Sequence, residues 1–298
     1  MVSASAVRDL REKTGAGMMD CKKALAETGG DFEKAVDLLR QKGLAALAKK
    51  AGRIAAEGLA AVRVSPDGKV GAVVEVNCET DFVAKNDDFK GFTSALAERA
   101  AVERPATIEA LLDSRMAGGK TVDETVKELV AKIGEKIEVR RFERFEGEAV
   151  SSYLHGGRIG VLVEGKGAAG ASALDALRDV AMHVAAARPR YVRREEVPAE
   201  ALERERAIYR AQGKESGKPE AIVEKMVAGR LEKFYSEVCL PDQVFVKDPD
   251  GKQTVAAFLK KAVPGLSVVR FARFEVGEGV EKKSEDFAAE VMSQVKPG

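Results

Sequence analysis

The sequence predicts an α+β fold with a duplicated core, in which each copy is an antiparallel sheet with helices on one face. The main observation is an internal repeat. The segment Gly68–Glu75 (GKVGAVVE) is matched by Gly157–Glu164 (GRIGVLVE). Further along, Arg141–Glu146 (RFERFE) is matched by Arg270–Glu275 (RFARFE). Because an apolar strand and a closing strand recur in the same order, we expect two related subdomains rather than a doubly wound parallel sheet.

Composition limits the class of protein. The 298 residues are 45% hydrophobic, which suffices for two or three domains with substantial cores. Charged residues make up 33% of the chain, but the net charge is only +1, so no overall field indicates DNA, RNA or a membrane as the main partner. The three cysteines are widely spaced, no signal peptide precedes them and no apolar run reaches bilayer length. We expect reduced thiols and a cytoplasmic location.

Residues 1–53 predict a small helical bundle followed by a basic linker. Apolar residues at helical spacing mark three helices, which are separated by glycines at Gly15–Gly17 and Gly29–Gly30. Asp31 can cap the third helix. We expect that helix to end at Gly43 and an Ala-rich, basic helical segment to lead into the next domain.

The first core subdomain, residues 54–150, contains the stretch around which the chain is organised. A valine-rich strand is expected to end near Asn77 or Cys78, and a helical pattern resumes at Phe89. Between them, Phe82 is expected on a turn. A ring on such a connection either tucks under its own loop or is presented to a partner, and geometry alone favours the tucked arrangement.

The second core subdomain, residues 151–276, is longer than the first because of an insertion. Residues 188–230 predict a protruding hairpin of two charged helices with a narrow apolar stripe. The high charge of these two helices is also explained if they simply face solvent and bind no partner. Residues 277–298 predict a C-terminal helical module, with a terminal helix from about Glu281.

Catalytic motifs are mostly excluded. His155 and His183 are the only histidines, and neither has cysteine or histidine neighbours at metal-ligand spacing. No nucleophile elbow and no phosphate-binding P-loop occur. Gly165–Gly170 fits G-x-G-x-x-G, which leaves an NAD(P)-binding oxidoreductase as an alternative. That fold needs a second parallel strand after the helix, yet the helix is followed by the basic stretch Arg188–Arg194.

A second alternative is an RNA-binding translation scaffold. The basic linker Lys49–Arg53 (KKAGR) could contact phosphates, in which case RNA binding would depend strongly on salt. The two methionines Met18 and Met19 begin a predicted helix. They either dock on a partner or divide between core and surface.

Six segments together resemble bacterial elongation factor Ts, and they span nearly the whole chain in the right order. They are LREKTGAGMMDCKKAL, VNCETDFVAKN, SYLHGGRIGVLVE, AMHVAAARPRYV, SGKPEAIVEKMVAGRLEKF and RFEVGEGVEKKSEDFAAEV. The resemblance implies a guanine nucleotide exchange factor for elongation factor Tu. It also implies an N-terminal ubiquitin-associated-like (UBA-like) bundle, a duplicated core, a helical hairpin and a C-terminal module.

The resemblance assigns roles to particular residues. The family's Thr-Asp-Phe-Val motif, which enters the partner's GTPase domain, is intact here as Thr80, Asp81, Phe82 and Val83. Phe82 would wedge in near the nucleotide and help dislodge the partner's Mg²⁺ and GDP. Further implied contacts with the partner are Arg11, Met18, Met19, Lys22, His155, Phe245 and Val246. The sequence Gln243–Phe245 (QVF) departs from the family's usual Gln-Pro-Phe, which weakens the carry-over of Phe245 and Val246.

An exchange factor of this kind is not an enzyme of covalent chemistry and needs no cofactor or metal of its own. If it weakens GDP binding to elongation factor Tu, GDP must weaken its own binding equally. Tight association is therefore expected with the nucleotide-free partner. No membrane and no direct nucleic-acid partner is expected, and the sequence leaves a homodimer open.

Overall fold

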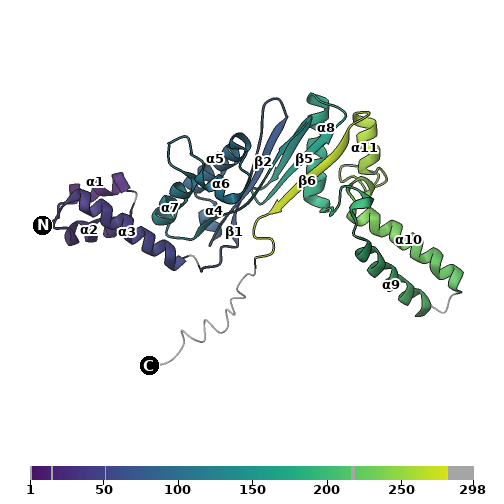
Figure 1. Cartoon of the computed structure of the whole chain (residues 1–298), viewed down its shortest axis with the longest axis horizontal. Helices are drawn as coiled ribbons and strands as arrows, with labels where there is room; N and C mark the ends of the chain where they lie inside the picture. Colours follow the sequence, from purple (N-terminus) through teal and green to yellow (C-terminus); the bar gives the residue numbers. More distant parts are fainter. Residues whose placement is uncertain (1, 15, 51, 216–218, 281–298) are drawn as a thin grey trace.

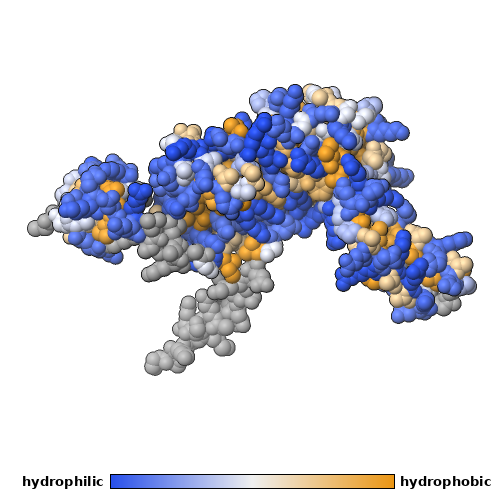
Figure 2. All heavy atoms as spheres, in the orientation of Figure 1, coloured by the Kyte–Doolittle hydropathy of each residue, from blue (hydrophilic) through white to orange (hydrophobic). Residues whose placement is uncertain are grey.

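The computed structural model describes residues 2–14, 16–50, 52–215 and 219–280. Figure 1 shows an elongated chain, with a helical bundle at one end, two sheets in the middle and a helical hairpin at the other end. On the face drawn in Figure 2, hydrophobic residues are scattered among hydrophilic ones over all three parts. Among the helices of the described residues, none combines the length and apolar character needed to span a bilayer.

The N-terminal bundle consists of α1 (Ala4–Thr14), α2 (Met18–Glu27) and α3 (Phe32–Lys50). Its small core includes Leu10 and Leu25. The prediction that Gly43 ends the third helix is wrong, because α3 continues to Lys50. A glycine inside a helix costs only about 1 kcal/mol relative to alanine, and the Ala-rich run that follows favours helix strongly.

The first sheet has the strand order β1-β2-β3, and all its pairs are antiparallel. Its strands are β1 (Glu57–Val64), β2 (Val70–Cys78) and β3 (Ile137–Glu146). The helices between β2 and β3 are α4 (Asp81–Ala84), α5 (Asp87–Glu103), α6 (Ile108–Asp113) and α7 (Val122–Ile133). Phe89, Phe92 and Leu96 of α5 are buried in a cluster that also contains Val74 and Val76 of β2.

The second sheet repeats this arrangement with the order β4-β5-β6, again antiparallel. Its strands are β4 (Ala149–His155), β5 (Ile159–Lys166) and β6 (Ser267–Glu275). Helix α8 (Ala171–Ala187) and helix α11 (Val255–Ala262) contribute to its core. The predicted α+β class with a duplicated antiparallel core is therefore confirmed.

The two sheets pack against each other through equivalent positions of the repeat. A Cβ atom at Gly71 would lie 2.7 Å from side-chain atoms of Leu162, and one at Gly160 would lie 2.8 Å from Val73. Only glycine allows both sheets to approach this closely. Gly71 and Gly160 are matched positions in the two repeated segments, so the contact is reciprocal.

The repeated Arg-Phe motif contributes a second set of contacts to this interface. The guanidinium of Arg141 lies 4.3 Å from the ring centre of Phe274 in the other sheet. Reciprocally, Arg270 lies 4.2 Å from the ring centre of Phe145. Because each arginine stacks on the phenylalanine of the opposite copy, the motif holds the two halves together by cation–π contacts as well as burial.

The insertion in the second copy forms the predicted protruding hairpin. It consists of a short 3₁₀ helix, η1 (Arg194–Glu196), α9 (Ala199–Glu215), α10 (Glu220–Val238) and a second short helix, η2 (Leu240–Asp242). Helix α10 continues beyond residue 230. Its later apolar residues Phe234, Tyr235 and Val238 pack in a cluster at the hairpin base. The predicted helix from about Glu281 lies outside the described residues.

Candidate partner-binding site

Strand β2 carries the chain from the first core directly to the candidate site. Val74, Val76 and Cys78 are completely buried in the cluster under α5. Thr80 then occupies the N-cap position of the short helix α4, with an extended backbone. The turn is therefore attached to a rigid strand on one side and to a helix on the other.

Glu135, in the connection between α7 and β3, fixes Thr80 with both carboxylate oxygens. The backbone N–H of Thr80 donates to Glu135 Oε2 at 2.9 Å, and its hydroxyl donates to Glu135 Oε1 at 2.7 Å. The thiol of Cys78 donates to the Thr80 carbonyl oxygen at 3.1 Å. Three polar atoms of the residue that opens α4 are thus held in place.

The neighbouring Glu79 makes a second link to the same connection. Its Oε1 accepts a hydrogen bond of 2.6 Å from the backbone N–H of Lys136, and Arg53 Nη1 lies 3.2 Å from its Oε2. Two acidic side chains, Glu79 and Glu135, therefore tie two segments that are distant in sequence. Arg53, part of the basic linker considered for RNA binding, is paired with Glu79.

Phe82 projects outward from α4 and is 78% exposed. Val83 and Ala84, which follow it, are buried instead. The expectation that the ring tucks under its own loop is wrong, because the helical turn directs Val83 and Ala84 into the core and leaves Phe82 on the outside. The Lys85 ammonium lies 5.7 Å from the ring centre.

The charges beside Phe82 are paired with each other. Lys85 Nζ lies 2.6 Å from Asp81 Oδ2, and this hydrogen bond lowers the pKa of Asp81. Burial, followed by the charges of Glu135 and Glu57, raises the pKa of Cys78 to about 12. Cys78 is consequently a neutral thiol donor at physiological pH, and not a reactive thiolate.

The residues carried over for the N-terminal bundle lie on its surface. Met18 is 53% exposed and Met19 is 61% exposed at the start of α2. The interpretation that places one of the two methionines in the core is therefore wrong. Arg11 on α1 and Lys22 on α2 are also exposed. These four residues share the bundle, well separated in Figure 1 from the second sheet.

The carried-over residues of the second copy differ in exposure. His155 lies exposed at the end of β4, where its Nδ1 is 3.1 Å from the Tyr153 hydroxyl. Phe245 is only 4% exposed and stacks on Phe258 with ring centres 4.1 Å apart. Val246 is 50% exposed.

A buried polar network holds the segment that carries Val246. The completely buried His183 of α8 accepts the backbone N–H of Val246 at Nδ1, and its Nε2 lies 2.9 Å from Gln243 Oε1. Since Nδ1 is the acceptor, the proton of this neutral imidazole sits on Nε2 and is donated to Gln243. Burial lowers the pKa of His183, which favours the same neutral form.

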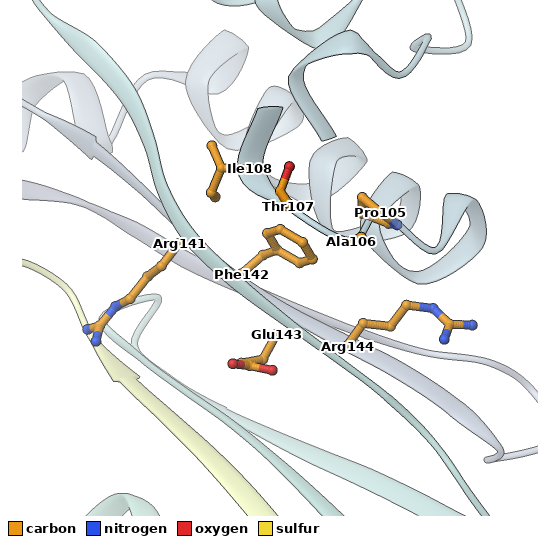
Figure 3. A pocket seen from close by; sticks show the side chains of 8 residues that line it. All are labelled: Pro105, Ala106, Thr107, Ile108, Arg141, Phe142, Glu143 and Arg144. Carbon is orange, nitrogen blue, oxygen red and sulfur yellow. The ribbon is translucent and has the colours of Figure 1, made fainter. Parts of the chain in front are cut away.

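The arginines that line one hollow on the surface of the described residues are engaged by other groups of the protein. This hollow of about 340 Å³ lies between the start of α6 and β3. Figure 3 shows the Phe142 ring in its middle, with Arg141 and Arg144 extending to opposite sides. Arg144 donates to the Ala101 carbonyl oxygen, and Arg141 pairs with Glu75. The two cations are therefore already engaged by the protein.

The glycine-rich turn of the second copy is filled by its own chain. Gly167 has φ +89°, and a Cβ there would lie 2.2 Å from the Gly265 carbonyl oxygen. Its N–H donates to Glu148 at 2.8 Å. Strand β5, which precedes the turn, pairs only with antiparallel neighbours. The parallel strand that an NAD(P) site requires is not present in this sheet.

Sequence reasoning missed Glu135, which the structure places at the site. It lies 55 residues from Thr80 along the chain, so no local pattern connects the two. Within the described residues, no group of three or more histidine, cysteine, aspartate or glutamate side chains could hold a metal ion. The arrangement instead offers an exposed aromatic on a rigid support, which suits binding to another protein.

Comparisons with known proteins point to one family. The family model described as elongation factor TS matches residues 79–278. The chain is 55% identical to elongation factor Ts of Alkalilimnicola ehrlichii over 297 residues, covering 99% of each chain. It is 54% identical to elongation factor Ts of Clostridium perfringens, covering 98% of each, and 54% identical to that of Methylococcus capsulatus, covering 99% of each.

Proposed function

The chain belongs to the elongation factor Ts family of translation elongation factors, and on this premise we propose that it is a guanine nucleotide exchange factor for elongation factor Tu. It would bind the GDP form of its partner in the cytoplasm, promote release of GDP and so allow GTP to bind. The observation that carries the proposal is Phe82, a large aromatic side chain that is 78% exposed on a rigidly held helical turn.

In the proposed mechanism, the Phe82 ring enters the GTPase domain near the site of Mg²⁺ and the phosphates. Thr80 is already fixed by Glu135, so little conformational freedom is lost when the ring is buried in the partner. Burial of a phenylalanine contributes roughly 1.5 to 3 kcal/mol. Since each 1.4 kcal/mol corresponds to about a tenfold change in rate, Phe82 alone accounts for one or two powers of ten.

Asp81 and Val83 would support the ring rather than enter the pocket with it. Val83 of α4 is buried, and its side chain anchors the turn in the core. Asp81 is held by Lys85 in an ion pair that is accessible to solvent on both sides. When the partner covers this pair, Asp81 can exchange Lys85 for a donor of the partner without a change in its own charge.

Further contacts would supply the rest of the acceleration. We assign Arg11, Met18, Met19 and Lys22 to one contact surface, because all four are exposed on the bundle. Methionine side chains adapt to many surfaces, which suits such a contact.

The second copy would provide a separate contact surface. His155 and Val246 are exposed and are assigned to it. Phe245, being buried, would position Val246 rather than contact the partner. Exchange itself is proposed to belong to the first copy, because the equivalent turn of the second copy, Gly165–Gly170, carries no aromatic residue.

Exchange of this kind involves no covalent step, and its thermodynamics are reciprocal. A factor that weakens GDP binding to elongation factor Tu must itself be displaced by GDP to the same extent. The chain is therefore proposed to bind nucleotide-free elongation factor Tu most tightly.

The test is release of a fluorescent GDP from purified elongation factor Tu, measured by stopped flow with and without this protein. The proposal expects release to become faster with increasing protein until it saturates. If release stays at the intrinsic rate while the two proteins form a complex, the exchange function is excluded. NAD(P) added at saturating concentration should leave the melting temperature of the chain unchanged.

A further inference from the structure

The segment Glu275–Val280, which we call the clasp, leaves the second copy at the end of β6 and crosses onto the first copy. The N–H of Gly277 donates to Glu75 Oε1 of β2 at 2.9 Å. Gly277 has φ +76°, and a Cβ atom there would lie 2.1 Å from the carbonyl oxygen of Ala56. The clasp therefore lies in backbone contact with the residue that precedes β1.

Glu75 is the centre of this contact and is completely buried. Besides Gly277, it receives hydrogen bonds from Arg140 Nη1 at 2.9 Å and from Arg141 Nε. A buried carboxylate is tolerated only when it is paired and hydrogen-bonded, and here two guanidinium groups and one backbone N–H meet that requirement. Each of the three donors comes from a different residue, and one of them belongs to the clasp.

The same two arginines also hold the clasp directly. Arg140 Nη2 donates to the Glu278 carbonyl oxygen at 2.5 Å, and Arg141 Nη2 donates to the Glu275 carbonyl oxygen at 3.2 Å. The N–H of Val276 donates to the Arg158 carbonyl oxygen at 2.9 Å. These four hydrogen bonds join the clasp to groups from both copies.

Within the described residues, the equivalent glutamate of the second copy receives no hydrogen bond from a crossing segment, although a Cβ at Gly147, in the connection between β3 and β4, would lie 2.5 Å from its Oε1. Glu164 occupies the repeat position of Glu75, and both lie where the closing strand shifts its register. Glu164 pairs with Arg270 at 2.6 Å, the counterpart of Arg141, but Val269 replaces the second arginine. The first copy, which carries Phe82, is the one whose central glutamate accepts a hydrogen bond from the crossing segment.

The clasp lies next to the end of the β1–β2 strand pair. The turn that carries Phe82 starts from the same end. Ala56, which Gly277 contacts, directly precedes Glu57, and Glu57 is the strand partner of Cys78. Two residues after Cys78, Thr80 begins the turn that presents Phe82. A displacement of the clasp would therefore shift Glu57 and Cys78, the last residue pair between β1 and β2.

We propose that Glu75 and the clasp form a positioning device that holds the end of β2, and with it Phe82, in the orientation needed for exchange. This inference rests on the proposed exchange function. It makes the second copy necessary for the action of the first, although the second copy carries no exchange turn of its own. Glu75 acts through the backbone and does not itself contact the partner.

A matched pair of glycine substitutions tests the proposal in the full-length chain. Gly277→Ala forces the clasp away from Ala56, whereas Gly279→Ala has the same φ of +76° but its Cβ would meet nothing closer than 3.9 Å. The readouts are stimulated GDP release at saturating factor, the half-saturating concentration, and hydrogen–deuterium exchange of residues 79–85. Gly277→Ala should lower the saturated rate at least about fivefold relative to Gly279→Ala and speed hydrogen exchange in that peptide. Equal saturated rates and equal hydrogen exchange would overturn the proposal.

A second pair keeps the test decisive if Gly277→Ala does not fold. Glu75→Gln and Glu164→Gln each remove one charge from an arginine-paired glutamate at matched positions. Glu75→Gln should slow saturated release and loosen residues 79–85, whereas Glu164→Gln should do neither. An equal loss in both variants would assign Glu75 a general stabilising role and overturn the proposal. If the unaltered protein does not accelerate release at all, the exchange function fails, but hydrogen exchange still reports whether the clasp orders the turn.

Discussion

The turns that follow β2 and β5 begin from matching strands but are used in opposite ways. After β2, the chain enters a short helix that leaves Phe82 exposed and buries Val83. After β5, Gly167 packs its backbone against Gly265, and the turn carries no aromatic side chain. The duplication has kept the strands and the interface between the sheets. In the proposed function, exchange belongs to the turn after β2, while the turn after β5 closes its own subdomain.

The difference lies in what each turn is fastened to. Thr80 is held by Glu135, a side chain from a distant connection, so its neighbour Phe82 is free to face outward. Gly167 is held by contacts that require the absence of a side chain.

The largest effect is expected from Phe82→Ala. Removing the exposed ring should slow stimulated GDP release roughly ten- to a hundredfold, because about 1.5 to 3 kcal/mol of burial in the partner is lost. Stopped-flow release measures this effect. Val102→Ala serves as a control, since Val102 is another exposed apolar residue, 58% exposed, at the far end of α5. An unchanged rate for Phe82→Ala would remove Phe82 from the mechanism.

A smaller effect is expected from Glu135→Gln, which weakens the hold on Thr80 without changing Phe82. Hydrogen bonds to charged groups contribute roughly 1.5 to 3 kcal/mol, and we expect part of this loss to appear as a three- to tenfold slower release. Glu138→Gln is the control, because Glu138 is an exposed neighbour paired with Lys136. Equal rates for the two variants would show that the turn does not depend on Glu135.

In the second copy, a substitution should change stability but leave exchange intact. Gly167→Ala places a Cβ 2.2 Å from a carbonyl oxygen, whereas Gly170→Ala, at nearly the same φ, meets nothing within 4 Å. The close contact should lower the free energy of unfolding by about 1 to 3 kcal/mol more for Gly167→Ala. Urea unfolding checks this difference. A loss of exchange in folded Gly167→Ala protein would contradict the division of roles between the two turns.

The smallest effect is a pH dependence confined to the second copy. His183 is buried and its pKa lies below the ordinary value of 6.5, so the unfolded chain binds a proton first as the pH falls. Stability should therefore begin to decrease below about pH 6.5, and His183→Gln should flatten that part of the curve. Hydrogen exchange measured from about pH 7.5 to pH 5 should show loosening near Val246 before any loosening in the first sheet. Simultaneous loosening of both sheets would contradict this prediction.

Much of the fold could be predicted from the sequence because local patterns and the repeat agree. The valine run of β2 and the matched Arg-Phe motifs predict two antiparallel sheets, and the structure has them. The bundle and the hairpin follow from glycine breaks and helical spacing. Two helix ends were predicted too early. Helix α3 continues past Gly43 because the alanines around it favour helix, and α10 continues past residue 230 because its apolar residues near Val238 pack in a cluster.

The site could be predicted only in part. The Thr-Asp-Phe-Val motif indicated the turn that we propose as the site, but local spacing could not show that Val83 rather than Phe82 faces the core. The supports of the turn come from far along the chain. Glu135 and Gly277 are recognised only when the fold brings them to Thr80 and Glu75. Phe245 differs in the opposite way. The resemblance implies that it contacts the partner, but the structure buries it in the core of the second copy.

The most direct test of the central claim is photocrosslinking from the two turns. A photoreactive p-benzoylphenylalanine is placed at position 82 in one protein and at position 168, in the glycine-rich turn, in another, and each is mixed with nucleotide-free elongation factor Tu. We predict a crosslink to the GTPase domain from position 82 that excess GDP suppresses, and none from position 168. A stable complex that gives no crosslink from position 82, or equal crosslinks from both positions, would contradict the account.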